Sequence, residues 1–474
     1  MRALWRGRRR RPGSLAVVAV VALVLLSSCG LRLDAEQKAA LAAAAASSDA
    51  VATSDGAPAD ASEDLTAPSA DGQTSAPTTT VRGASATGGG ATPAATATDS
   101  CVPQPVKEVG VSDSEIVLGN VSMLSGPIPG AGQSGIDGAR AYLSYINSIG
   151  GVCGRKLRLV TGDDRTDSGQ NRAEAKRLSG QALGLIGGAS IVDSGTADAL
   201  AGTNVPAIQV AVAQNALRSP NIFSPSPLDP TNANGGSVPA WRYFHRSVGL
   251  QHVGIVVVSI ASARERAGVY VKDIQNAGLA VTGVHEVGLA ETNFVAVAQQ
   301  LVNEGADGFI GLLDPVASAR LARAVKQIGW HPLVAHYGAQ NYGQPFLDLA
   351  GDAAEGALIP LAFDIFEDAG ANPAVGRFVD WFARTAPGHT PDFYGAMGWA
   401  SADMMVDALR AAGPAPTRDA VLAHLRTVTS FDAHGFLAPC NPAGKVTSPY
   451  FMVATVTNGK WRRVYPDAGF GDGT

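Results

Sequence analysis

The chain has 474 residues, of which 46% are hydrophobic and 16% charged, and its formal net charge is -5. This length and composition can bury cores for two domains of ordinary size. The negative charge gives no electrostatic footprint for nucleic acid, which excludes a nucleic-acid partner.

A secretory leader is predicted at residues 1–28. Arginines near the start precede an unbroken apolar run from Leu15 to Leu26, which is the order of an export signal. The run is about half the ~20 residues that a membrane-spanning helix needs, so a permanent span is disfavoured. The segment from Leu26 to Cys29 resembles the bacterial lipobox, in which the cysteine becomes the lipid-modified first residue. We therefore expect an anchor at Cys29 on the extracytoplasmic face of the cell membrane; a free cysteine beside an ordinary cleavage site is the alternative.

Residues 29–110 are predicted to form a disordered tether. The segment consists mostly of Ala, Ser, Thr, Gly, Asp and Pro and contains no aromatic residue. Such a composition cannot bury enough apolar surface to offset the entropy of ordering. A tether of this length lets a folded domain stand off a membrane.

From Glu115 onward, apolar runs typical of buried strands alternate with apolar residues at helical spacing. Because strands that alternate with helices form parallel sheets covered on both faces, and because the alternation starts afresh at Val253, two sheets are predicted. Asn458-Gly459 between two apolar runs indicates a closing hairpin. The expected strands are 116–121, 157–161, 184–187, 205–210, 253–260, 281–287, 309–313, 450–456 and 460–464, and the expected helices are 136–146, 173–183, 269–276, 294–302, 375–384 and 394–412.

Three cysteines remain after Cys29, so at most one intramolecular disulfide forms among Cys101, Cys153 and Cys440. A helix that follows a parallel strand ends at the sheet edge where the strand began. Cys153 follows the first helix and Cys101 precedes the first strand, which favours a bridge between these two. A free Cys153, or one paired with Cys440, is the alternative.

The stretch VLGNVSMLSGPIPGAGQSGIDGARAYLSYINSIGGVCGRKLRLVTGDD resembles the opening of the branched-chain amino acid and amide class of periplasmic-type binding proteins. The segments from Gly351 to Gly356 and from Tyr394 to Leu409 are similar to later signatures of that family, and the match runs from residue 112 to 464. The resemblance implies an α/β fold of two Rossmann-like lobes, the type I periplasmic binding protein fold. Lobe 1 would comprise 111–242 and 362–438, and lobe 2 would comprise 243–361 and 439–474.

The same resemblance implies three hinge crossings between the lobes, near Trp241 to Val248, Ile359 to Phe363 and Phe436 to Pro442. Ligand would bind between the lobes at the carboxyl ends of the strands and be buried by closure. Hydroxyls and backbone N–H groups at strand ends suit a carboxylate or carbonyl. The implied ligand-binding residues are Ser125, Ser190, Ser194 and the backbone from Ala211 to Ala213 in lobe 1, and Asp314, Tyr337 and Gly338 in lobe 2.

Two positions depart from the amino acid binders of that family. Ala213 stands where a threonine holds the ligand, and Gly338 stands where an acidic residue pairs with the ligand's ammonium. Asp314 could replace that charge. The ligand classes left open are amino acids, amides, small carboxylates and aromatic compounds. As an alternative role, Ser190, Ser194 and Asp314 would only cap the helices that follow them.

The segment from Gly130 to Gly135 fits the G-x-G-x-x-G pattern of dinucleotide-binding units, so an NAD-dependent enzyme is an alternative function. Pro127 and Pro129 in the preceding loop and the exported location disfavour it, and the glycines would instead shape the mouth of the cleft. The sequence has no G-x-S-x-G or H-E-x-x-H motif. His331 and His336 lack metal-ligand neighbours and are predicted to be surface or packing residues. No catalytic residue, metal or cofactor is predicted.

The function expected is therefore that of a monomeric lipoprotein that captures a small solute for the membrane permease of an ABC importer. A ligand sensor that feeds a signalling partner is the alternative, because it also needs a domain held near a membrane. Neighbouring genes would discriminate the two: permease and ATPase genes favour transport, whereas a kinase or transcription factor favours sensing.

Overall fold

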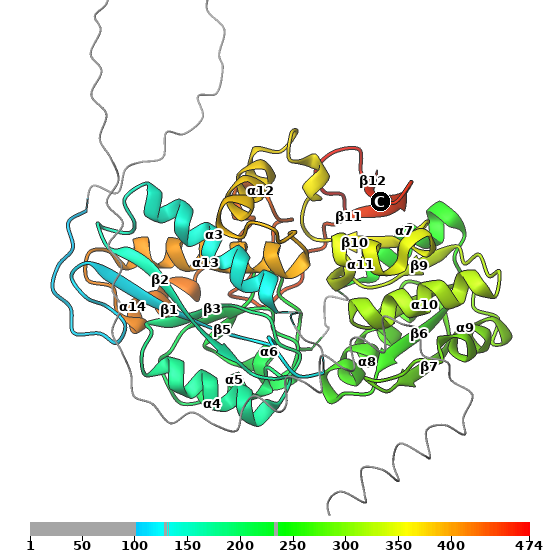
Figure 1. Ribbon diagram of the computed structural model, residues 1–474, viewed down its shortest axis with the longest axis horizontal. Coiled ribbons are helices and arrows are strands. Elements are labelled where there is room, and N and C mark those ends of the chain that lie inside the picture. The colour runs from blue at the N-terminus through cyan, green and yellow to red at the C-terminus, as the bar shows by residue number, and fades with distance from the viewer. Residues whose placement is uncertain (1–100, 128–129, 131, 232–235) are drawn as a thin grey trace, which may run out of the picture. The chain divides into compact units, whose positions relative to one another are not determined.

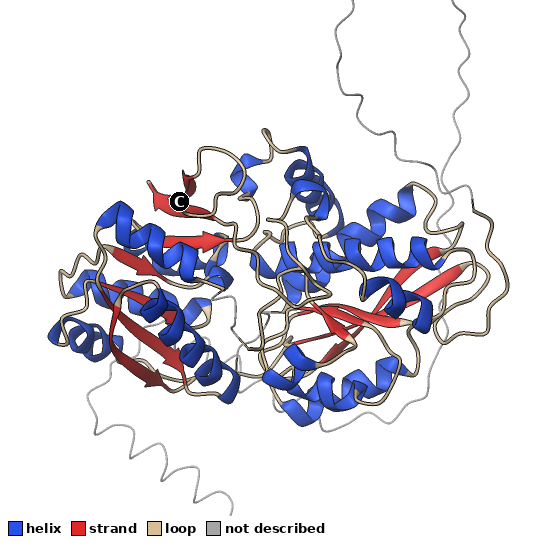
Figure 2. Cartoon of the chain, turned by 180° about the vertical axis from the view of Figure 1, so that it is seen from behind, coloured by secondary structure: helices blue, strands red, loops and turns tan. Residues whose placement is uncertain are grey.

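A computed structural model describes residues 101–127, 130, 132–231 and 236–474. The predicted leader, Cys29 and residues 29–100 of the predicted tether lie outside the described residues. The described part folds into two α/β lobes (Figures 1 and 2). Lobe 1 is built from residues 101–223 and 364–437, and lobe 2 from residues 238–361 and 452–465.

Lobe 1 contains a five-stranded parallel sheet in the order β2-β1-β3-β4-β5. The first strand lies inside the sheet, and its side chains at Ile116 and Leu118 are fully buried, as expected for a strand covered on both faces. The strands are β1 (Glu115–Ser122), β2 (Lys156–Asp163), β3 (Gly184–Gly188), β4 (Ala207–Gln209) and β5 (Ile222–Phe223).

Helices cover both faces of this sheet. In Figure 1, α3 and α13 lie on one side and α4 and α5 on the other, so segments far apart in sequence share one layer. The helices are α3 (Gln133–Ser148), α4 (Ser168–Ser179), α5 (Ser194–Leu200), α6 (Gln214–Arg218), α12 (Pro373–Thr385), α13 (Phe393–Ala412) and α14 (Arg418–Leu425).

The glycines that suggested a dinucleotide site have packing roles in the structure. A Cβ on Gly132 would lie 2.8 Å from the Cβ of Ser122, and a Cβ on Gly135 would lie 3.1 Å from the carbonyl oxygen of Gly187. Small residues here let α3 approach the sheet closely. Gly130 has φ of +75°, which glycine adopts without strain.

Lobe 2 contains a parallel sheet in the order β7-β6-β8-β9 and an antiparallel sheet in the order β10-β11-β12. A parallel bridge between Ala335 and Ala357 joins them. The strands are β6 (His252–Val258), β7 (Ala280–Val287), β8 (Gly308–Leu312), β9 (Val334–His336), β10 (Leu358–Leu361), β11 (Met452–Thr457) and β12 (Lys460–Tyr465), and the helices are α7 (Val238–Val248), α8 (Ala261–Asn276), α9 (Phe294–Asn303), α10 (Pro315–Gln327) and α11 (Gln344–Ala350).

The first crossing between lobes differs from the prediction. Residues 241–248 do not form a hinge strand but belong to α7, so the predicted lobe boundary at residue 242 falls inside a helix. Trp241 and Phe244 lie three residues apart on its buried face and pack into the same apolar cluster as Val253 and Ile255 of β6. The chain therefore crosses before α7, between β5 and Val238.

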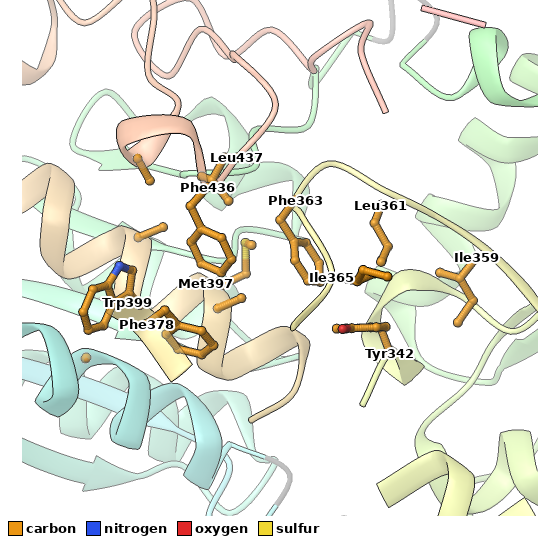
Figure 3. Packing of buried hydrophobic residues seen from close by; sticks show 14 of the residues in the cluster. Tyr342, Ile359, Leu361, Phe363, Ile365, Phe378, Met397, Trp399, Phe436 and Leu437 are labelled. Atoms are coloured by element: carbon orange, nitrogen blue, oxygen red, sulfur yellow. The ribbon is translucent and has the colours of Figure 1, made fainter. Parts of the chain in front are cut away.

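The other two crossings run side by side, because Phe363 and Leu437 form an antiparallel bridge. The ring of Phe363 lies between Tyr342 of lobe 2 and Phe436 of lobe 1, with centroid distances of 5.3 and 6.2 Å (Figure 3). Phe436 stacks in turn on Phe378 of α12 at 5.2 Å. Aromatic packing thus ties the two lobes together along these crossings.

A disulfide joins Cys101 and Cys153, and Cys440 is a buried free cysteine. Residues 101–110, predicted to belong to the tether, are part of lobe 1. The guanidinium of the buried Arg155 donates hydrogen bonds of 2.7 Å to the carbonyl oxygens of Gln104 and Pro414. Among the described residues, the folded part therefore already includes Cys101, about ten residues before the predicted start of lobe 1.

Candidate ligand-binding cleft

A cavity of about 320 Å³ lies between the two lobes. Lobe 1 contributes residues that follow β1, β3 and β4, and lobe 2 contributes residues at or after the ends of β6, β7, β8 and β9. The cavity therefore lies at the carboxyl ends of both parallel sheets, where open α/β sheets generally bind ligands. These residues are Met123, Ile191 and Val210 to Val212 in lobe 1, and Val258, Leu289, Leu312 to Asp314 and His336 in lobe 2.

The walls of the cavity are mainly apolar. Among the described lining residues, the side chains of Lys, Arg, Asp and Glu type are those of Arg266 and Asp314 alone. Ionisable groups are therefore few, and each has a strong effect on the charge of ligand that fits. The other polar lining residues are His336, Gln340, Ser226, Ser237, Ser262, Thr447, Ser448, Tyr270, Tyr394 and Tyr450.

Arg266 lies on α8 with its guanidinium carbon 4.5 Å from the ring centroid of Tyr270. The two residues are one helical turn apart, which places them on the same face of α8. Within the described residues the structure gives Arg266 no carboxylate partner. The cation–π contact positions the guanidinium while its N–H donors stay available to a ligand.

His336 ends β9 and is almost fully buried. Burial lowers its pKa to about 3, so the ring is neutral at physiological pH. The backbone N–H of Gly338 donates a 3.0 Å hydrogen bond to Nδ1, which places the ring proton on Nε2. The ring lies 5.9 Å from Trp241, another lining residue, and so offers one N–H donor in an aromatic wall.

The structure places three of the sequence-predicted ligand positions against the cavity, namely Ala211, Val212 and Asp314. Ala211 follows β4 and Asp314 follows β8. Asp314 also caps α10, because its carboxylate accepts hydrogen bonds from the N–H groups of Val316 and Ala317. Asp314 therefore forms the helix cap and also lines the cavity, so capping is not its only structural position.

The other predicted residues of lobe 1 do not line the cavity. Ser125 donates to Asp163 through its hydroxyl. The Ser190 hydroxyl is buried, accepts a 3.3 Å hydrogen bond from the side-chain amide of Asn171 and does not cap α5. Ser194 is the first residue of α5, and no side-chain cap forms at that helix end. Ala213 precedes α6 and points its N–H at Asp193.

In lobe 2, Tyr337 and Gly338 are also absent from the lining residues. The ring of Tyr337 is buried against Phe309 and Phe346, at centroid distances of 5.3 and 5.1 Å. Gly338 has φ of +84° and contributes its N–H to His336. The neighbouring residue His336 is buried against Trp241, as expected for a packing residue, and it also lines the cavity.

Sequence reasoning also missed Trp241, Arg266 and Tyr270. A signal was present for the last two, because an arginine four residues before a tyrosine lies on the same face wherever both belong to one helix. The extent of that helix was the obstacle, since it was expected to begin at Val269 and begins at Ala261.

Asp193 supports the part of the cavity wall that is formed by the segment after β4. Its two carboxylate oxygens accept hydrogen bonds of 2.9 and 3.0 Å from the N–H groups of Val212 and Ala213. Burial raises the pKa of this carboxyl to about 7 despite the two bonds, which favour the charged form. Asp193 is thus a positioning residue for the segment after β4.

One set of side chains has metal-ligand geometry among the described residues. Oxygen and nitrogen atoms of Asp403, Asp407 and His434 lie within 4.8 Å of one another, away from the cavity lining. The hydrogen bond and charge of Asp403 raise the pKa of His434 to about 9. The imidazolium therefore supplies the positive charge between the two carboxylates, and the group is an ion-pair network.

The chain matches the family model described as periplasmic binding protein over residues 115–460. This match spans most of the chain, so the protein belongs to the periplasmic binding protein family. Its family and its structural neighbours are binding proteins, not enzymes. A search of curated proteins gives no match. Among the described residues, no helix combines the length and apolar character needed to cross a bilayer.

Solved structures share the fold at low sequence identity. A fatty acid ABC transporter substrate-binding protein from Thermomonospora curvata has a TM-score of 0.68 and 19% identity, covering 79% of this chain and 96% of its own. The leucine binding protein LivK from Thermotoga maritima has a TM-score of 0.62 and 16% identity, covering 74% and 97%. A solute binding protein of R. palustris in complex with benzoate has a TM-score of 0.62 and 18% identity, covering 75% and 96%. These likenesses establish the type I periplasmic binding protein fold.

Proposed function

We propose that the protein is an extracytoplasmic solute-binding lipoprotein of an ABC importer. It captures a small solute of the amino acid, amide or small carboxylate class between two closing lobes and presents it to a membrane permease. The observation that carries this proposal is the cavity of about 320 Å³ lined by strand ends of both lobes. A ligand that contacts both lobes binds the closed form better and shifts the open–closed equilibrium toward it.

Support for the transport role comes from the neighbours of known fold. Their names describe a fatty acid ABC transporter substrate-binding protein, a leucine binding protein, and an ABC transporter solute binding protein in complex with benzoate. All three solutes are small molecules with a carboxylate and an apolar body. The chain is expected to act as a monomer, because each copy contains both walls of its own cavity.

The lipid anchor rests on the sequence from Leu26 to Cys29. Multiple acyl chains on Cys29 hold a protein at a membrane without a spanning helix. Replacement of Cys29 by Ser should release the protein from the membrane fraction of expressing cells. Membrane retention of that variant would contradict the anchor while leaving the solute-binding proposal intact.

A thermal-shift screen of the full chain tests the binding function. The panel comprises amino acids, amides, small and aromatic carboxylates, and a nicotinamide dinucleotide as the enzyme control. A solute at 100 times its dissociation constant stabilises the fold by about 2.7 kcal/mol. We expect a hit among the small solutes, and uptake of that solute should depend on the protein. A shift with the dinucleotide alone would contradict the proposal.

A further inference from the structure

The cavity has an asymmetric set of charged groups. Arg266 and Asp314 are its lining residues of Lys, Arg, Asp or Glu type within the described chain. The carboxylate of Asp314 already accepts hydrogen bonds from Val316 and Ala317 at the start of α10. The positive end of that helix compensates its charge. Arg266 has no such compensation, so the uncommitted charge in the cavity is positive.

The position of Arg266 distinguishes it from its neighbour Arg264 on the same helix. Arg264 is paired with Glu286 at 2.7 Å and does not line the cavity. Arg266 instead lies over the ring of Tyr270, which also lines the cavity. A guanidinium stacked on a ring keeps its planar set of donors free, and this set matches the two oxygens of a carboxylate.

The remaining walls favour an apolar ligand body. Aliphatic lining residues come from both lobes, and Trp241, Phe363 and Phe393 add aromatic surface. The volume of about 320 Å³ lies in the range of small-molecule binding sites. An ammonium group on the ligand would need a carboxylate partner, and the charge of Asp314 is already compensated at the start of α10, where its Oδ1 accepts both N–H bonds.

Within the proposed binding function, on which this inference rests, we infer that the solute is a small monocarboxylate with an alkyl or aromatic body and no ammonium group. Its carboxylate pairs with the guanidinium of Arg266, its body packs on the apolar walls, and the N–H of His336 supplies a second polar contact. In this proposal lobe 2 binds the acid group of the solute, whereas the sequence led us to expect that hydroxyls at the strand ends of lobe 1 would bind it.

The test compares ligands that share one carbon skeleton by isothermal titration calorimetry on the full chain. Hexanoate carries a carboxylate as its only polar group, and hexanamide carries a neutral amide in its place. Norleucine adds an α-ammonium group to the acid, and hexylamine carries a positive charge instead of a negative one. Benzoate and benzamide give the same acid–amide comparison on an aromatic ring. We expect hexanoate or benzoate to bind at least about tenfold more tightly than its partner compounds, because a charge-assisted contact is lost in each of them.

Two variants assign the contact to its residue. Arg266→Gln should weaken carboxylate binding at least about tenfold while leaving hexanamide binding unchanged within about twofold. Arg264→Gln is the matched control on the same helix and should bind carboxylates as the parent chain does. The thermal midpoint of each variant without ligand shows whether the fold is intact.

The outcomes separate this inference from the proposed function. Tighter binding of hexanamide or norleucine than of hexanoate, or equal carboxylate binding by the Arg266 variant, would overturn the carboxylate assignment and leave the solute-binding function standing. Failure of every solute in the thermal-shift panel would overturn the solute-binding function itself. Tight carboxylate binding that depends on Arg266 supports both.

Discussion

Oδ1 of Asp314 accepts a 2.9 Å hydrogen bond from the N–H of Val316 and so closes the first turn of α10. The residue therefore has a structural role in addition to lining the cavity. Loss of a helix N-cap costs about 1 kcal/mol, so Asp314→Ala should lower the free energy of unfolding of the ligand-free chain by about that amount. Asp314→Asn keeps a capping oxygen and should retain the parent stability.

Urea unfolding of the two Asp314 variants checks this prediction. If Asp314→Ala were as stable as the parent chain, the cap would contribute nothing and the residue would serve the ligand alone. Carboxylate binding is expected to survive in both variants, since removal of a negative charge from the cavity does not oppose an anion.

The architecture was more predictable than the site. The alternation of strands and helices and the resemblance predicted two parallel sheets, and the Asn458-Gly459 hairpin lies between β11 and β12 as expected. Both turn residues have positive φ, which this dipeptide tolerates well. α7 was missed, because the resemblance placed a hinge where Trp241 and Phe244 form a helical apolar face.

Which residues line the site depends on the direction in which each side chain points at the end of its strand. His336 and Tyr337 are neighbours, yet the first faces the cavity and the second packs into the core. Successive side chains on a strand point to opposite faces, so an alignment error of one residue exchanges the two roles. Sequence alone does not fix that register. The pairing of Arg266 with Tyr270 likewise depended on where α8 begins.

Asp193 is predicted to support binding without touching the solute. Its oxygens receive the N–H groups of Val212 and Ala213, and Val212 lines the cavity. Asp193→Asn offers one acceptor oxygen in place of two, which leaves a buried N–H without a partner and costs about 1–3 kcal/mol. We expect a lower unfolding free energy and weaker solute binding.

Asp198→Asn is the matched control, because Asp198 is an exposed residue of α5, the helix that Asp193 immediately precedes. Chemical unfolding and calorimetry on both variants make the comparison. A variant at Asp193 that kept the stability and affinity of the parent chain would show that the wall after β4 holds its position without this carboxylate.

The contact between α3 and α13 should tolerate no added methyl group. A Cβ on Gly138 would lie 1.9 Å from the carbonyl oxygen of Gly395, and a Cβ on Gly398 would lie 2.0 Å from that of Gly135. Gly138→Ala forces the helices apart and should lower the unfolding free energy by about 1–3 kcal/mol. Gly268, inside α8, has open space around it, so Gly268→Ala should be neutral or stabilising by up to about 1 kcal/mol. Equal effects of the two substitutions in urea unfolding would contradict the close helix contact.

The ion pair of His434 with Asp403 should make stability depend on pH. The hydrogen bond and charge of Asp403 raise the pKa of His434 to about 9, and Asp407 acts in the same direction while Arg377 opposes it. Because the folded-state pKa lies above the unfolded value of about 6.5, the stabilisation is fully present below pH ~6.5 and is lost as the pH rises through ~9.

His434→Gln should therefore lower the thermal midpoint at pH 6, and the difference from the parent chain should vanish at about pH 10. The imidazole is 56% exposed, so the difference should also shrink at high salt. His331→Gln, at an exposed position without an ion pair among the described residues, is the control and should show no such pH dependence. A constant difference between parent and His434 variant across this pH range would mean that the pair does not titrate as its geometry implies.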